Sequence, residues 1–100
     1  MSNKVSTLMA QAFENGYKLS MGNTCATGDR VLYLHGNAIA KFDDGQLFIN
    51  LCGWNTQTTK ARLNALSGVS VHNVKGEACL NGVPMPVSGW VKVPMESQFI

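Results

Sequence analysis

Four turn motifs that contain glycine recur between short β-prone stretches, and they constrain the fold of this chain more than any other feature. Glycine beside a polar residue adopts the positive φ angles of tight hairpin turns at little steric cost. The four motifs are Gly36-Asn37, Asp43-Asp44-Gly45, Lys75-Gly76 and Asn81-Gly82. Because the stretches that they separate are short, the sequence predicts antiparallel hairpins.

The first group of β-prone stretches predicts a meander. These stretches are residues 30–35, 38–42 and 46–52. Three sequential strands with tight turns form most simply an antiparallel meander. Alternation along the first strand places Tyr33 and His35 on the face opposite Leu34. Residues 17–29, which are rich in Gly, Asn, Ser and Thr, are expected to form a loop.

The C-terminal third predicts a smaller β element. Residues 69–72 and 77–80 are expected to pair as a hairpin. Pro84 and Pro86 confine the following segment to an edge or an irregular strand, because proline cannot donate to a sheet ladder. Residues 89–94 are expected to add a last strand.

Two short helices complete the prediction. Residues 5–14 carry apolar side chains at helical spacing. Residues 56–66 follow Trp54, with Thr56 as the expected N-cap and Thr58 as its competitor. The predicted fold class is therefore α+β: a small antiparallel sheet, made of a three-strand meander plus a C-terminal hairpin, packed with two short helices.

The length and amino-acid composition limit which classes of protein this chain can belong to. One domain is expected over residues 1–100, with loose termini at 1–4 and 95–100. Charged residues are 14% of the chain, against roughly 25% in typical globular domains. Apolar surface that charge leaves uncovered favours a homo-oligomer. No stretch of the sequence is apolar over the length of a membrane span, so none is expected. The first residues lack the apolar segment of a signal peptide, so a secretory signal is not expected either.

Catalytic and metal-binding sets are not expected. The chain has three cysteines and two histidines, at Cys25, Cys52, Cys79, His35 and His72. Their separation does not form the close-spaced ligand pairs of structural metal sites, and no nucleophile signature surrounds any cysteine. The sequence therefore predicts a protein that is not an enzyme and that needs neither a metal nor a cofactor.

One stretch gathers candidate binding residues. The start of the second predicted helix carries three threonines and two cations, namely Thr56, Thr58, Thr59, Lys60 and Arg62. A helix N-terminus presents free N–H groups and the positive end of the helix dipole, which favour a phosphate. Capping alone explains one threonine but not three. We take these five residues as the hypothetical phosphate site.

Aromatic residues flank this stretch. Trp54 and Trp90, with Tyr33 and His35, could form a stacking surface for a base. The alternative is that such rings fill the core of a small sheet. Net charge is only +2, with the cations scattered singly, and this balance argues against a nucleic-acid binder.

Two stretches together resemble a family of small proteins encoded by tailed bacteriophages. They are Leu32-Tyr-Leu-His-Gly-Asn-Ala-Ile-Ala40 and Trp54-Asn-Thr-Gln-Thr-Thr-Lys-Ala-Arg-Leu-Asn-Ala-Leu66. The resemblance extends to an Ala12-Phe13-x-x-Gly16 start, an Asn23-Thr24 loop and Cys79-Leu-Asn-Gly82, and it covers residues 10–83. It implies a phage gene product that works in the cytoplasm of an infected bacterium, and it assigns no residue roles.

The expected function is therefore binding. A phage accessory protein of this size would capture a host protein or a nucleotide-like small molecule, and so inhibit host defence or a host enzyme. The alternative is a nucleic-acid-binding module that uses the Thr/Lys/Arg helix to track phosphates.

Overall fold

The structure is a computed structural model that describes residues 4–93. Strands dominate it, with 37% of these described residues against 22% in helices. The described helices are α1 (Lys4–Asn15) and α2 (Gln57–Asn64). The described strands are β1 (Leu19–Met21), β2 (Thr24–Ala26), β3 (Val31–Leu34), β4 (Asn37–Asp43), β5 (Gln46–Ile49), β6 (Val71–Val74), β7 (Glu77–Leu80), β8 (Val83–Pro84) and β9 (Val91–Lys92).

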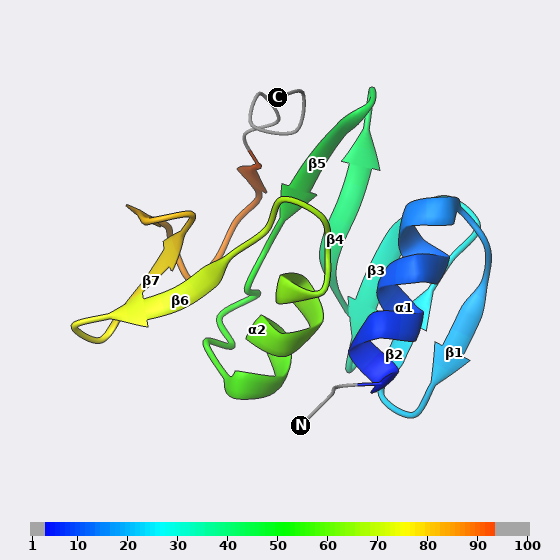
Figure 1. The fold of residues 1–100 in the computed structure, drawn as a ribbon, viewed down its shortest axis with the longest axis horizontal. Coiled ribbons are helices and arrows are strands. Elements are labelled where there is room, and N and C mark those ends of the chain that lie inside the picture. Colours follow the sequence, from blue (N-terminus) through cyan, green and yellow to red (C-terminus); the bar gives the residue numbers. More distant parts are fainter. Residues whose placement is uncertain (1–3, 94–100) are drawn as a thin grey trace.

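The strands form two antiparallel sheets (Figure 1). The first has six strands in the order β1-β2-β3-β4-β5-β9, and the second has three in the order β6-β7-β8. The prediction of an α+β fold with one small sheet is therefore wrong, because the protein is mostly β. The predicted meander is present as β3, β4 and β5, but it is only the centre of a wider sheet.

A hairpin in the predicted loop accounts for part of the error. β1 and β2 lie within residues 17–29 and pair with each other, and β2 pairs with β3. Thr24 and Ala26 are fully buried even though their neighbours are polar. Ladder hydrogen bonds to β3 determine this strand, so an apolar alternation pattern does not mark it.

The last strand, β9, accounts for the rest of the error in the predicted fold. β9 pairs with β5, with Phe48 opposite Lys92 and Ile49 opposite Val91. Val93, just beyond it, is fully buried and donates its N–H to Leu47 O at 2.9 Å. The strand predicted at residues 89–94 thus joins the large sheet, and not the hairpin that precedes it. A pairing this distant in sequence leaves no local signal.

One turn is displaced from its predicted position. The β3–β4 turn lies at His35-Gly36, with φ of 53° and 79°, one residue before the predicted Gly36-Asn37. A non-glycine residue with positive φ is uncommon. Because His35 occupies the turn, it no longer follows the alternation of β3, and this determines where its ring lies.

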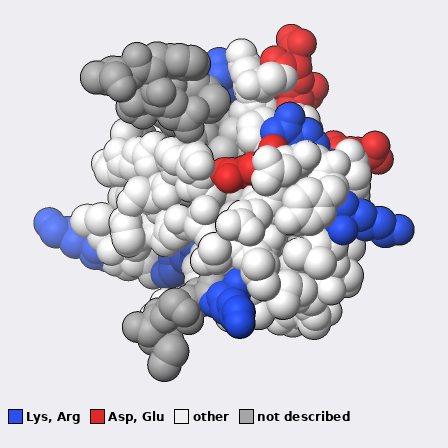
Figure 2. All heavy atoms as spheres, turned by 45° about the vertical axis from the view of Figure 1, so that its right-hand side comes forward, with Lys and Arg blue, Asp and Glu red and all other residues white. Residues whose placement is uncertain are grey.

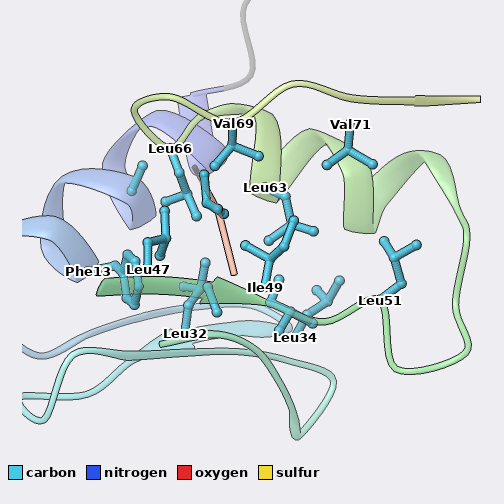
Figure 3. Packing of buried hydrophobic residues seen from close by; sticks show 14 of the residues in the cluster. Phe13, Leu32, Leu34, Leu47, Ile49, Leu51, Leu63, Leu66, Val69 and Val71 are labelled. Atoms are coloured by element: carbon cyan, nitrogen blue, oxygen red, sulfur yellow. The ribbon is translucent and has the colours of Figure 1, made fainter. Parts of the chain in front are cut away.

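Both helices pack on one face of the large sheet. Figure 3 shows Leu32, Leu47 and Ile49 directed from the strands towards Leu63 of α2 and Leu66, which lies just after that helix. Met9 and Phe13 of α1 belong to the same cluster and are fully buried. We call this helix-covered side the inner face and the opposite side the outer face.

Two asparagine side chains join the small sheet to α2. Asn64 Nδ2 donates to Val71 O at 3.1 Å, and Val71 N donates to Asn64 Oδ1 at 2.6 Å. Asn64 thus takes the place of a neighbouring strand at the edge of β6. Asn81 bonds in the same way to Ser70 N and Gly68 O. These contacts fix the loop that follows the helix.

The expected loose termini, 1–4 and 95–100, lie outside the described residues except for Lys4, the first residue of α1. No helix within residues 4–93 is long and apolar enough to cross a membrane.

Candidate functional site

The N-terminal turn of α2 is fixed by a threonine cap. Thr56 has extended backbone angles, φ −109° and ψ 164°, and its Oγ1 accepts the N–H of Thr59 at 3.2 Å. The two hydroxyl oxygens of Thr56 and Thr59 lie 3.1 Å apart. Thr59 is buried, whereas Thr58 is exposed. The three threonines are therefore not equivalent: two build the cap and one faces outward.

A hollow of about 480 Å³ opens beside this cap. Its apolar part is formed by Leu34, Ile39 and Leu51, from β3, β4 and the end of the β5 segment. The remaining lining residues are His35, Asn37, Trp54, Thr56, Thr58 and Thr59. We call this cavity the Trp54 hollow. No Lys or Arg of the described residues lines it.

Trp54 borders the hollow and remains open to solvent. Its side chain is 60% exposed, which is unusual for a tryptophan. The chain reaches it through a sharp turn at Cys52-Gly53, with φ of 57° and 79°. Trp54 N donates to Leu51 O at 2.8 Å, and Gly53 N donates to Val87 O. The backbone that carries the ring is therefore held on both sides.

His35 lines the hollow because of its place in the turn. Its backbone N–H donates to Asn23 O at 2.8 Å, and its Nε2 lies 3.3 Å from Asn23 Nδ2. These contacts fix the imidazole against the β1–β2 turn. The imidazole adds a polar ring to a cavity that is also lined by the Asn37 side chain, threonine hydroxyls and apolar groups.

The two cations of the predicted phosphate site point elsewhere. Arg62 Nε donates to Thr24 Oγ1 at 2.9 Å and its Nη1 donates to Ser6 Oγ at 2.7 Å. Arg62 thus links α2 to α1 and β2, and partial burial lowers the pKa of its guanidinium. Lys60 lines a separate hollow of about 330 Å³, together with His72 and Asn73.

Tyr33 is also separated from the hollow. It stands opposite Cys25 and Ala38 in the sheet register and is half-buried. It belongs to the outer face, whereas His35, two residues later, turns to the inner side. The structure therefore brings Trp54 and His35 together with Thr56, Thr58 and Thr59. Tyr33, Lys60 and Arg62 do not line this cavity.

Several lining residues had no signal in the sequence. Leu34 and Leu51 are buried, and alternation cannot show that a buried position borders an open cavity. Ile39 precedes Ala40 at a register irregularity of β4, and both are buried. This irregularity turns two successive residues inward and could not be located from the pattern.

The described cysteines are reduced and lie apart from this cavity. Cys52 Sγ donates to Ala38 O at 3.1 Å, and burial raises the pKa of the thiol. A raised pKa makes the nucleophilic thiolate scarcer. Within residues 4–93 no three His, Cys, Asp or Glu side chains are grouped so that they could hold a metal ion.

Asn55 adds one unsatisfied group to the segment before α2. Its Oδ1 is buried without a hydrogen-bond partner among the described residues. Such groups are few in folded proteins. This acceptor lies between Trp54 and the Thr56 cap in the chain.

Comparison with known proteins gives one match. A family model described as "Kyanoviridae Gp96 protein" matches residues 2–96. No curated protein and no solved structure matches the chain significantly.

Proposed function

The chain belongs to the Kyanoviridae Gp96 protein family, a family of phage proteins, and we propose that it works inside the infected bacterium by binding rather than by catalysis. The expectation of a phage protein is confirmed at the level of the family. In this proposal the protein captures a small nucleotide-like molecule in the Trp54 hollow. Sequestering such a molecule would inhibit a host defence system or a host enzyme that depends on it.

The supporting observation is the combination of an open tryptophan with a cavity of ligand size. Its volume of about 480 Å³ falls within the roughly 300–1,000 Å³ of small-molecule sites. Trp54 offers an aromatic plane for a base, and the floor is aliphatic. Hydroxyls and the His35 ring offer the few directed hydrogen bonds that fix orientation in such sites.

The lack of cations on the cavity wall indicates which part of a nucleotide-like ligand would enter it. With no Lys or Arg of residues 4–93 on its wall, the hollow favours a base and a sugar over a phosphate. A phosphate would lie at the N-terminal turn of α2, near Thr58, where backbone N–H groups point outward. Thr58 also lines a neighbouring hollow of about 380 Å³, together with Gln57 and Arg62. Arg62 borders this second hollow while its guanidinium stays bonded to Ser6 and Thr24.

A host protein is the second candidate ligand. An exposed tryptophan beside an aliphatic cavity is also typical of a surface that receives an apolar side chain from a partner. The nucleic-acid alternative that uses α2 has less support. Lys60 and Arg62 line different hollows, and on the face drawn in Figure 2 the Lys and Arg side chains stand apart from one another.

Tryptophan fluorescence tests the proposal. In a Trp90→Phe variant, Trp54 is the sole tryptophan, so its emission reports on the hollow alone. We expect saturable quenching by at least one member of a panel of nucleosides and their phosphates. The Thr58→Ala substitution should weaken this binding. Ser20→Ala removes a hydroxyl on β1, away from the hollow, and should not. The second candidate would be favoured by two results together. No member of the panel would quench the emission, and a host protein would be captured by the wild-type protein but not by Trp54→Ala.

The low proportion of charged residues continues to favour self-association. We propose a homo-oligomer as the working state, and the intact mass of the native protein would determine its order.

A further inference from the structure

The outer face of the six-stranded sheet carries a row of residues unlike the rest of the surface. The strand registers place Lys41 of β4 opposite Phe48 of β5, and Phe48 opposite Lys92 of β9. Adjacent strands lie about 4.8 Å apart. The three side chains therefore form a continuous row of cation, aromatic ring and cation. Phe48 alternates with the buried Leu47 and Ile49, so it points away from both helices, and its partners Lys41 and Lys92 lie on the same face.

Trp90 joins this row from the segment before β9. The Nζ of Lys41 lies 4.6 Å from the Trp90 ring centroid and 5.7 Å from that of Phe48. Trp90 is 39% exposed, Lys92 is exposed, and Phe48 is half-buried. Phe48 is held on the backbone of β5, Trp90 directly precedes β9, and both rings are partly exposed. We call Lys41, Phe48, Trp90 and Lys92 the outer-face cluster.

The strand residues of this sheet carry more positive than negative charge. Lys41 and Lys92 are the cations among them, and Asp43, which alternation places on the same face as Lys41, is the one acid. Packing this face against a second copy would bring lysines towards lysines, with few carboxylates to compensate. The face is therefore complementary to an anionic partner.

We infer that the outer-face cluster binds single-stranded nucleic acid, with bases stacked on Phe48 and Trp90 and phosphates bound by Lys41 and Lys92. Aromatic side chains on an open sheet face, with cations between them, are the usual platform for unpaired bases. A duplex hides the faces of its bases, so the same rings would not engage it. Cation–π contacts now hold Lys41 over the rings, and a phosphate would draw its ammonium outward as a base takes that position.

This site is separate from the Trp54 hollow and does not depend on it. Trp54 lies beside the cap of α2 on the inner side, whereas Trp90 lies on the outer face with Lys41. Each tryptophan can therefore report on one site when the other is replaced by phenylalanine.

The test is a titration of Trp54→Phe protein with a short oligothymidylate over a series of salt concentrations. Two phosphate contacts predict that log affinity falls with log salt with a slope of about −1.4, since each contact on a single strand contributes about 0.7. Lys92→Gln, at an exposed position, and Lys41→Gln should each reduce the slope by about 0.7. Phe48→Ala should weaken binding roughly 5- to 100-fold, because each stacked base is lost with its ring.

Lys75→Gln, in the exposed β6–β7 turn, is the matched control and should leave both the affinity and the slope unchanged. A duplex of the same length should not displace the single strand. The proposal is overturned if Trp90 emission does not respond at low salt, or if Lys75→Gln acts as strongly as Lys92→Gln. It is also overturned if the lysine substitutions alter the oligomeric mass but not the binding.

Discussion

The two sides of α2 use similar polar residues for different purposes. On one side, Arg62 donates to Ser6 and Thr24, whose side chains are almost fully buried. On the other side, Thr58 and Trp54 are exposed at the Trp54 hollow. The first set fixes the helix to α1 and β2, while the second remains available to a ligand. Within one short stretch, residue type alone does not separate structure from site.

The largest effect should come from the apolar contact of the fixed side. Leu63 is fully buried in the core, and Leu63→Ala should lower the free energy of unfolding by about 2–5 kcal/mol. Denaturant unfolding measures this. Trp54→Ala should cost far less, because most of that side chain is already in water. Equal losses for the two variants would contradict the distinction between the two sides.

Arg62 should behave as part of the fixed side. Arg62→Ala removes hydrogen bonds from two buried hydroxyls, and we expect a loss of about 2–3 kcal/mol in unfolding free energy. Lys60→Ala should change it by less than about 0.5 kcal/mol, as surface substitutions do. If Arg62→Ala instead kept full stability and abolished ligand binding, Arg62 would belong to the ligand site.

The cap should give an intermediate effect. Thr56→Ala removes the acceptor for Thr59 N–H and should cost about 1 kcal/mol. Thr58→Ala should leave stability within about 0.5 kcal/mol and weaken ligand binding roughly 5- to 10-fold, the worth of one hydrogen bond. Thermal unfolding and fluorescence titration of the same two proteins give both quantities. If Thr58→Ala lowered stability and Thr56→Ala weakened only ligand binding, the roles assigned to the two threonines would have to be exchanged.

The smallest effect concerns Cys52, in the turn before Trp54. Burial raises the pKa of its thiol above the ordinary value of 9.0, so the folded state holds the proton more tightly than the unfolded state. Its contribution to stability is full below pH 9.0 and declines as pH rises from there towards the raised pKa. Cys52→Ser keeps a donor for Ala38 O but does not titrate in this range. Unfolding free energies of the two proteins should diverge above this pH, and parallel curves would contradict the account.

Local patterns in the sequence predict the local parts of this structure. Thr56 as the cap, the β3–β4–β5 meander and the Lys75-Gly76 and Asn81-Gly82 turns each depend on neighbouring residues. β2 and β9 were missed or misplaced because their partners determine them. β2 is polar and depends on β3, and β9 finds β5 across more than forty residues of chain.

The candidate site shows the same difference between features set by neighbouring residues and features set by distant ones. The sequence predicts a site at Trp54 and the threonines because these residues are neighbours along the chain, and the structure places them around one cavity. It could not show that His35 turns inward at a left-handed position, nor that Arg62 reaches Ser6. Both depend on how distant segments pack.

Native mass spectrometry of gently purified wild-type and Trp54→Ala proteins, each supplemented with the nucleoside and nucleotide panel, tests the central claim most directly. The account predicts a bound small molecule on the wild-type protein that is absent or much depleted on Trp54→Ala, with Trp90→Phe behaving as wild type. If all three proteins show only their own ligand-free masses, or if all three carry the same bound molecule, the assignment of the Trp54 hollow as the ligand site is contradicted.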